Sequence, residues 1–162
     1  MVKKEIENIV NKLLDKGLSG VEFFDELDEH IVNNISIIKG LLDLVPENSG
    51  IVLSGGFGRK VSQLIESGSL PKINYILFNG GIRSGKEPEI LIDNLGDKTD
   101  LYFLDDTIYG GKTYKDIRDY LNPERLVKSV YVVYDGAPVE RDWVNSLFRY
   151  YDYFESKPNF KF

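Results

Sequence analysis

The chain has 162 residues, enough for a single domain over 1–162 with a sizeable core, and its apolar share of 42% is ordinary for a globular protein. Its net charge of -6 argues against binding to nucleic-acid backbones or membrane surfaces, since both rely on clustered cations. The absence of cysteine excludes disulfides, thiolate metal sites and thiol nucleophiles. No apolar run is long enough for a membrane span and charged residues interrupt the start, so a cytoplasmic protein is expected.

The first 45 residues predict helices. Apolar residues recur at helical spacing up to Gly17, where a first helix should stop. Ser19 and Glu22 have the spacing of a capping box for a second helix, and the apolar pattern of that helix continues to Leu44. His30 lies within this pattern, where a lone histidine is expected to be structural or solvated.

After Gly50 short apolar strands alternate with helices. The expected strands cover 51–54, 74–78, 101–104 and 127–134, and the expected helices cover 61–67 and 113–121. This alternation predicts an α/β fold with a mainly parallel sheet flanked by helices. Such sheets bind ligands at the carboxyl ends of their strands, and here those ends are rich in glycine, in charge or in both.

The stretch LYFLDDTIYGGKT at 101–113 combines two acids with a glycine-rich turn. Gly110 and Gly111 allow backbone N–H groups to turn inward, and the following helix adds its positive end, which together suit a phosphate. Asp105 and Asp106 would repel that phosphate, but carboxylates accept hydrogen bonds from hydroxyls and attract divalent cations. A sugar phosphate satisfies both halves, whereas a solvated turn or a helix cap remains the alternative.

This stretch resembles the thirteen-residue signature of the type I phosphoribosyltransferases, in both their hypoxanthine–guanine and their uracil-type, pyrimidine-regulator forms. The resemblance covers residues 50–136 as a phosphoribosyltransferase-like core, with 1–45 as a helical hood or the contact of a homodimer. It implies transfer of ribose 5-phosphate from phosphoribosyl pyrophosphate to a nucleobase-like acceptor in nucleotide salvage, with Mg²⁺. The roles it implies are catalysis by Asp105, Asp106 and Tyr109, Mg²⁺ binding by Asp105 and Asp106, and 5′-phosphate binding by Tyr109, Gly110, Gly111, Lys112 and Thr113.

Two earlier segments agree with this resemblance in order and spacing. A loop after the first strand would bind the pyrophosphate through Gly55, Gly56, Phe57, Gly58, Arg59 and Lys60. The alternative for that segment is a tight strand–helix connection. Residues 82–89 would form a mobile loop over the site, or else an ordinary hairpin, and the residues expected to act there are Arg83, Ser84, Gly85 and Lys86.

The chain also departs from the hypoxanthine-type pattern. Tyr109 stands where those enzymes carry an acid, and Gly136 stands where they place a lysine that reads the purine. Trp143 is predicted either to stack on a base or to lie in the core. The aromatic tail is expected to serve packing or a subunit contact through Tyr150, Tyr151, Tyr153 and Phe154.

Two other functions compete with the transferase. A non-catalytic sensor of phosphoribosyl pyrophosphate or a nucleotide would need the same fold and the same binding residues. A P-loop NTPase is the second rival, because residues 80–87 nearly match its motif. In that motif, however, Glu87 replaces the hydroxyl that would contact magnesium.

Overall fold

The structure of the chain is a computed structural model that describes residues 2–18, 20–80, 85, 87–98, 100–122 and 124–149. Its helices are α1 (Val2–Asp15), α2 (Gly20–Val32), α3 (Ile35–Leu42), α4 (Gly55–Glu66) and α5 (Lys112–Leu121). Its strands are β1 (Gly50–Ser54), β2 (Tyr75–Phe78), β3 (Ile90–Asp93), β4 (Asp100–Ile108), β5 (Leu126–Asp135) and β6 (Val144–Arg149). None of the described helices combines the length and the apolar character needed to cross a membrane.

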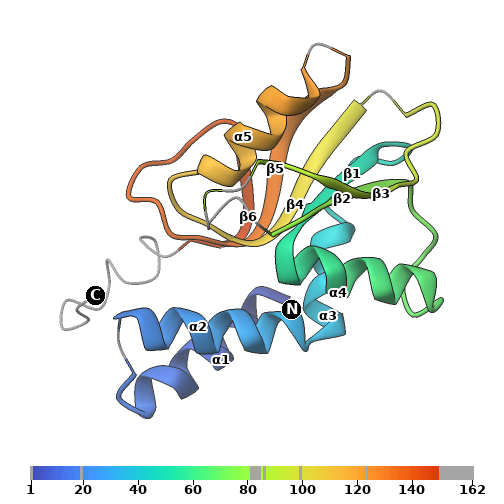
Figure 1. Cartoon of the computed structure of the whole chain (residues 1–162). Helices are drawn as coiled ribbons and strands as arrows, with labels where there is room; N and C mark the ends of the chain where they lie inside the picture. Colours follow the sequence, from blue (N-terminus) through green and yellow to red (C-terminus); the bar gives the residue numbers. More distant parts are fainter. Residues whose placement is uncertain are drawn as a thin grey trace.

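The six strands form one sheet in the order β3-β2-β1-β4-β5-β6. Neighbouring strands are parallel except for β2 and β3, so the predicted mainly parallel sheet is confirmed. Strands β1 and β4 are neighbours at the centre, with Val52 opposite Phe103. Their carboxyl ends, each followed by a glycine-rich junction and a helix, therefore lie side by side at one edge of the sheet (Figure 1).

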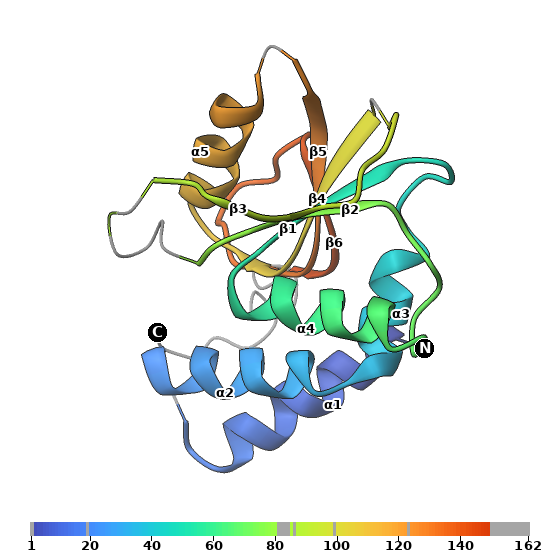
Figure 2. The same ribbon diagram turned by 45° about the vertical axis from the view of Figure 1, so that its right-hand side comes forward.

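Helices cover both faces of the sheet. Helix α5 lies on one face, and α1 to α4 lie on the other (Figures 1 and 2). The N-terminal helices pack directly on the sheet, α2 against β4, α3 against β5 and α1 against β6. Successive strand residues enter opposite cores, as Val52 and Leu53 do, because side chains alternate along a strand. The predicted flanking helices, including a helical N-terminal region, are thus present.

The apolar pattern that runs to Leu44 belongs to two helices rather than one. Helix α2 ends at Val32, and Asn34 begins α3 with extended backbone angles. Its side-chain oxygen accepts a hydrogen bond from the backbone N–H of Ile37 at 3.2 Å. Asparagine favours such a cap over a helix interior, and this preference explains the break.

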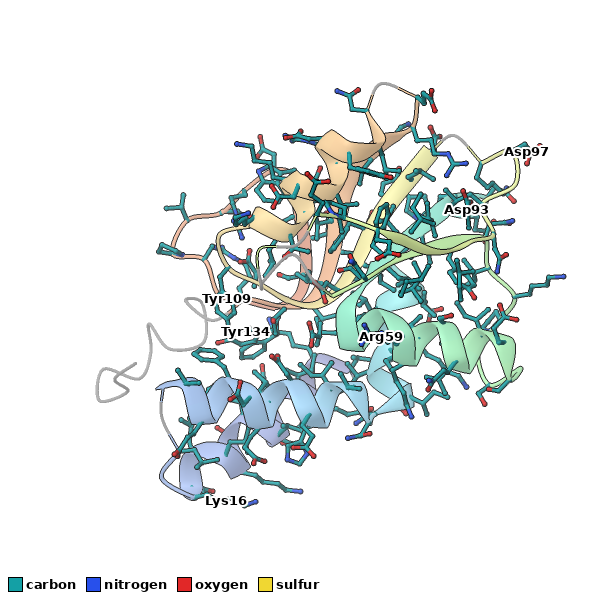
Figure 3. The ribbon with its side chains drawn as sticks, viewed as in Figure 1. Lys16, Arg59, Asp93, Asp97, Tyr109 and Tyr134 are labelled. Carbon is teal, nitrogen blue, oxygen red and sulfur yellow. The ribbon has the colours of Figure 1, made fainter. Side chains whose placement is uncertain are left out.

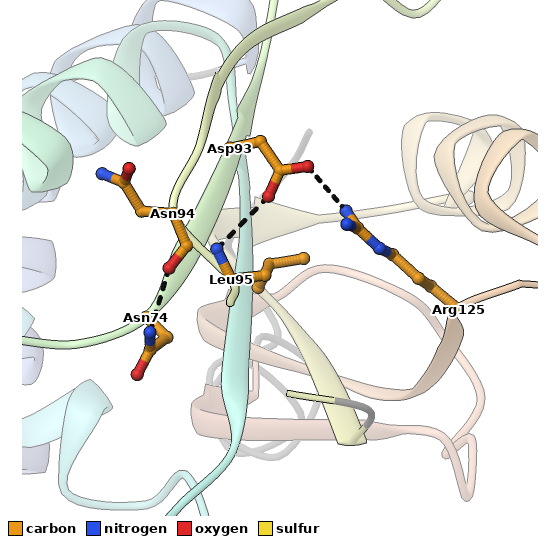
Figure 4. Close-up of polar contacts among 5 residues, drawn as sticks. All are labelled: Asn74, Asp93, Asn94, Leu95 and Arg125. Atoms are coloured by element: carbon orange, nitrogen blue, oxygen red, sulfur yellow. Dashed lines mark hydrogen bonds and ion pairs between the residues drawn. The ribbon is translucent and has the colours of Figure 1, made fainter. Parts of the chain in front are cut away.

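The edge strand β3 was not expected from the sequence. Its residues are mostly exposed, so it lacks the buried apolar run that identifies the central strands. Polar contacts fix its end instead (Figure 4). Asp93 accepts hydrogen bonds from Arg125 at 2.9 Å and from the backbone N–H of Leu95 at 3.2 Å, while Asn74 donates to the carbonyl of Asn94 at 3.0 Å.

Candidate active site

A cleft of about 740 Å³ opens at the carboxyl ends of β1 and β4. Four segments supply its described lining, namely the end of α2, the β1–α4 junction, the β2–β3 connection and the β4–α5 junction. The lining residues are Asp28, Glu29, Val32, Asn33, Ser54, Gly55, Gly56, Phe57, Arg59, Asn79, Gly80, Glu89, Asp105, Asp106 and Thr113. The cleft therefore brings together the two motifs that the sequence singled out.

The two aspartates lie inside a strand rather than just beyond it, since β4 continues to Ile108. Both are partly buried and both line the cleft. The backbone N–H of Asp106 donates to Asp105 Oδ1, and the N–H of Thr107 donates to Asp106 Oδ1, each at 2.8 Å. These bonds fix one oxygen of each carboxylate against the backbone of β4.

The β4–α5 junction is a short loop with a second cavity beneath it. Gly111 has a φ of 85°, a conformation that glycine adopts readily, and α5 begins at Lys112. The Lys112 ammonium pairs with Asp116 on the same helix at 2.7 Å. The cavity under residues 109–113, which we name the loop pocket, has a volume of about 210 Å³ and shares Asp105 and Thr113 with the cleft.

The β1–α4 junction is tighter than the expected loop. Residues 55–60 form the first turns of α4, which begins at Gly55 instead of near residue 61, so the connection is a tight strand–helix junction. The pyrophosphate-binding role expected for this segment stays a prediction. A Cβ on Gly58 would lie 3.0–3.1 Å from Leu77 and Leu53, which shows that this glycine permits close packing of helix against sheet. Arg59 lines the cleft, whereas Lys60 is not among its described lining residues.

Both helices that begin at the cleft lack a side-chain cap. The Ser54 side chain, at the N-cap of α4, makes no capping hydrogen bond, and Gly111, at the N-cap of α5, has no side chain to make one. Helix α3, which follows the cleft-lining residue Asn33, is capped by the side chain of Asn34. The first N–H groups of a helix need partners and carry partial positive charge, so these two uncapped ends can receive anionic groups.

Sequence reasoning missed the contribution of α2. Asp28 and Glu29 line the cleft, and with Glu89 they raise its acidic side chains to five against one described cation, Arg59. No periodic or motif signal marks these residues, because only the docking of α2 brings them to the site. No group of three or more His, Cys, Asp or Glu side chains within the described part of the chain could hold a metal ion by itself.

Tyr109 lies in an aromatic contact between the loop and α2 (Figure 3). Its ring meets Phe24 edge-on with centroids 5.4 Å apart, and Phe24 also contacts Tyr134 at 5.9 Å. A Cβ on Gly136 would overlap the Tyr109 ring at 2.3 Å. The two departures from the hypoxanthine-type pattern are therefore coupled, because the tyrosine ring occupies the space next to the glycine.

Trp143 packs behind the loop. Its ring stacks on Tyr114 at 5.0 Å, the Arg141 guanidinium lies 4.7 Å from its centroid, and a Cβ on Gly111 would lie 2.8 Å from it. Trp143 is not among the described residues that line the cleft or the loop pocket, and His30 does not line them either.

The expected mobile loop lies mostly outside the described residues, as do Arg83, Ser84, Lys86 and the aromatic tail. Its ends belong to an antiparallel hairpin, because β2 pairs with β3 and the N–H of Asn79 donates to the carbonyl of Glu89 at 2.9 Å. The P-loop interpretation required a helix after residue 87, and the structure has strand β3 there.

Comparison with known proteins gives matches at the level of structure. No protein-family model matches the chain, and no curated protein matches it. It is similar to an orotate phosphoribosyltransferase from Aeropyrum pernix, with 16% identity and a TM-score of 0.50 over 79% of this chain and 80% of that one. It also matches a hypoxanthine phosphoribosyltransferase from Staphylococcus aureus, with 20% identity and a TM-score of 0.39 over 73% of each chain. The similarity to the orotate phosphoribosyltransferase shows that the chain has a type I phosphoribosyltransferase fold.

Proposed function

We propose that this protein transfers ribose 5-phosphate from phosphoribosyl pyrophosphate to a nitrogenous base and releases pyrophosphate. The observation that carries the proposal is the meeting of two uncapped helix N-termini on either side of a partly buried pair of aspartates. The substrate has the matching order of groups, with a phosphate at each end and a ribose diol between them. One anionic end suits each helix, and the diol suits the carboxylates.

Each group of the substrate has an expected position. The 5′-phosphate would bind the backbone of residues 109–113 at the start of α5, and the pyrophosphate would bind the start of α4 beside Arg59. Asp105 and Asp106 would accept hydrogen bonds from the ribose hydroxyls. As the bond from C1 to the pyrophosphate oxygen breaks, its electron pair leaves with the pyrophosphate and positive charge grows on the ribose, which the two carboxylates stabilise. A base nitrogen then forms the new bond to C1.

The donor set of the cleft fits Mg²⁺. Its oxygen ligands suit a hard cation, and five carboxylates against one arginine would repel a free pyrophosphate. Mg²⁺ usually binds through one or two carboxylates together with substrate phosphates, which agrees with the absence of a three-ligand group among the described residues. Asp105 and Asp106 would contact the ion, and it would supply charge neutralisation of the leaving group.

A sensor that only binds phosphoribosyl pyrophosphate is the second candidate. The contact of Tyr109 with Gly136 and Phe24 favours it, because aromatic and glycine residues replace the acid and lysine of the hypoxanthine-type pattern. A sensor and an enzyme would share the phosphate and ribose contacts. They differ in whether an acceptor base can approach C1.

The test is a panel of nucleobases incubated with phosphoribosyl pyrophosphate and Mg²⁺, with pyrophosphate release as the measurement. We expect release with at least one base and none with the Asp105→Asn/Asp106→Asn variant. Calorimetric titration of the wild type with phosphoribosyl pyrophosphate runs in parallel. Tight binding without release for any base would establish the sensor, and absence of binding would exclude both.

A further inference from the structure

A buried hydroxyl in β4 has no role in the reaction as proposed above. Thr107 is 5% exposed, and its Oγ1 has no hydrogen-bond partner among the residues that the structure describes. Its main chain is held, since its N–H donates to Asp106 Oδ1 and it stands opposite Tyr134 in the sheet. The hydroxyl is therefore the group that lacks a partner, and burying such a group costs free energy.

The fold alone does not explain a threonine at this position. Valine has nearly the same shape, suits a strand equally well and would leave no polar atom buried. The surroundings are also apolar, because Phe103, Val130 and Val132 line the same cavity. A hydroxyl kept in such surroundings indicates a partner that is not part of the chain.

The position of Thr107 identifies that partner. It lines the loop pocket, and Asp105, which lies two residues earlier on the same face of β4, lines both this pocket and the cleft. The loop of residues 109–113 and the uncapped start of α5 close the pocket on its other side. A group that enters from the cleft beside Asp105 thus reaches the backbone of the loop and the Thr107 hydroxyl together.

We propose that the Thr107 hydroxyl donates a hydrogen bond to the phosphate monoester that the loop pocket receives, and so positions the ribose next to the two aspartates. This inference rests on the proposed function, because it uses the 5′-phosphate position given there. Thr107 lies within the stretch 101–113, but the order of residue types there assigns it no role. The chemical class of the ligand group is a dianionic sugar phosphate.

The test uses an isosteric pair of variants. Thr107→Val removes the hydroxyl, and Thr107→Ser keeps it. We expect Thr107→Val to raise the midpoint of thermal unfolding without ligand, because the unpartnered group is gone. The same variant should bind ribose 5-phosphate roughly 10-fold or more weakly by calorimetry, the scale of a hydrogen bond to a charged group, while Thr107→Ser stays within a few-fold of wild type.

Pyrophosphate together with Mg²⁺ is the matched control ligand, since it is expected at the start of α4, and its affinity should not change in either variant. Equal binding of ribose 5-phosphate by wild type and Thr107→Val overturns the inference. Should Thr107→Val fail to fold, Thr107→Ser and Thr107→Ala decide the same point, and equal binding by these two overturns it. If the wild type binds ribose 5-phosphate but releases no pyrophosphate with any base, the transferase fails while the Thr107 contact stands.

Discussion

The two strand–helix junctions at the cleft differ in how tightly the helix follows the strand. After β1 the helix starts at once, and Gly58 packs its first turns against Leu53 and Leu77. After β4 a loop intervenes, Gly111 takes a positive φ, and a cavity of about 210 Å³ lies beneath. The β1–α4 junction is therefore packed against the core, whereas the β4–α5 junction encloses a cavity.

This difference suggests that the two junctions bind different phosphate groups of the substrate. A loop that encloses a cavity can surround a phosphate that stays bound during the reaction, which suits the 5′-phosphate. A helix start packed directly on the sheet offers donors along one open side, which suits a pyrophosphate that must leave. Side-chain bonds also tie the second half of α4 to the start of β2, since Ser62 donates to Tyr75 at 2.9 Å and Tyr75 donates to Glu66 at 2.7 Å.

The largest expected effect comes from the aspartates between the junctions. Asp105→Asn/Asp106→Asn should keep the fold, because the amide oxygen can still accept the backbone N–H bonds that the carboxylates accept now. Affinity for phosphoribosyl pyrophosphate with Mg²⁺ should fall by at least ~1–3 kcal/mol, measured by calorimetry. Normal binding by a folded double variant would show that the ribose lies elsewhere and that the junctions do not share one substrate.

The second test breaks the loop junction. Gly111→Ala places a side chain at positive φ and 2.8 Å from Trp143, so unfolding free energy should drop by about 1–3 kcal/mol and ribose 5-phosphate binding should weaken. Gly110→Ala is the matched control, since no atom lies within 4 Å of its Cβ. Chemical unfolding and calorimetry on both variants give the comparison. Equal behaviour of the two variants would mean that the loop conformation is not needed.

The third test breaks the helix junction instead. Gly58→Ala brings a Cβ within 3.1 Å of the Leu53 backbone, so the unfolding free energy should fall by about 1–2 kcal/mol. Gly56→Ala meets nothing within 4 Å and should be neutral or slightly stabilising. We expect Gly58→Ala to leave ribose 5-phosphate binding unchanged. A loss of that binding with full stability would reverse the assignment of the two junctions.

The smallest effect concerns the tyrosine behind α4. Tyr75→Phe removes two hydrogen bonds and should lower the unfolding free energy by about 0.5–1.5 kcal/mol at neutral pH. Burial raises the pKa of Tyr75 above its ordinary value of 10.0, so the folded state retains the proton longer than the unfolded state does. Its contribution is complete below pH 10.0 and is lost as the pH rises through the raised pKa. Unfolding curves across that range should converge for wild type and Tyr75→Phe, and curves that stay parallel would contradict this.

The sequence predicted the central strands and the alternation well, because β1 and β2 are buried throughout and β4 and β5 each contain an apolar run, at 101–104 and 130–134. It did not predict β3 or β6, which lie at the edges of the sheet and carry mixed residues. The start of α4 was also placed too late, since glycines in 55–60 suggested a loop. Gly58 instead lets α4 pack closely against Leu53 and Leu77, and this contact is visible only once the neighbouring strands are placed.

The same limit applies to the site. Asp105, Asp106 and the loop of 109–113 lie in one continuous stretch, so their chemistry was legible from the order of residue types. Asp28 and Glu29 reach the cleft only through the packing of α2 on β4. Thr107 differs again, because its significance depends on a missing hydrogen bond, a property that no local pattern records.

The adjacency of β1 and β4 has a consequence for how the protein reaches its native state. Val52 and Phe103 are partners in the sheet although β2 and β3 lie between them in the chain, so this pairing must close a long loop before any of its contacts form. Non-local parallel pairing of this kind makes folding slow. The cleft forms only when β1 and β4 pair. The rate at which ligand binding recovers during refolding therefore reports the closure of the central sheet, not the earlier formation of helices.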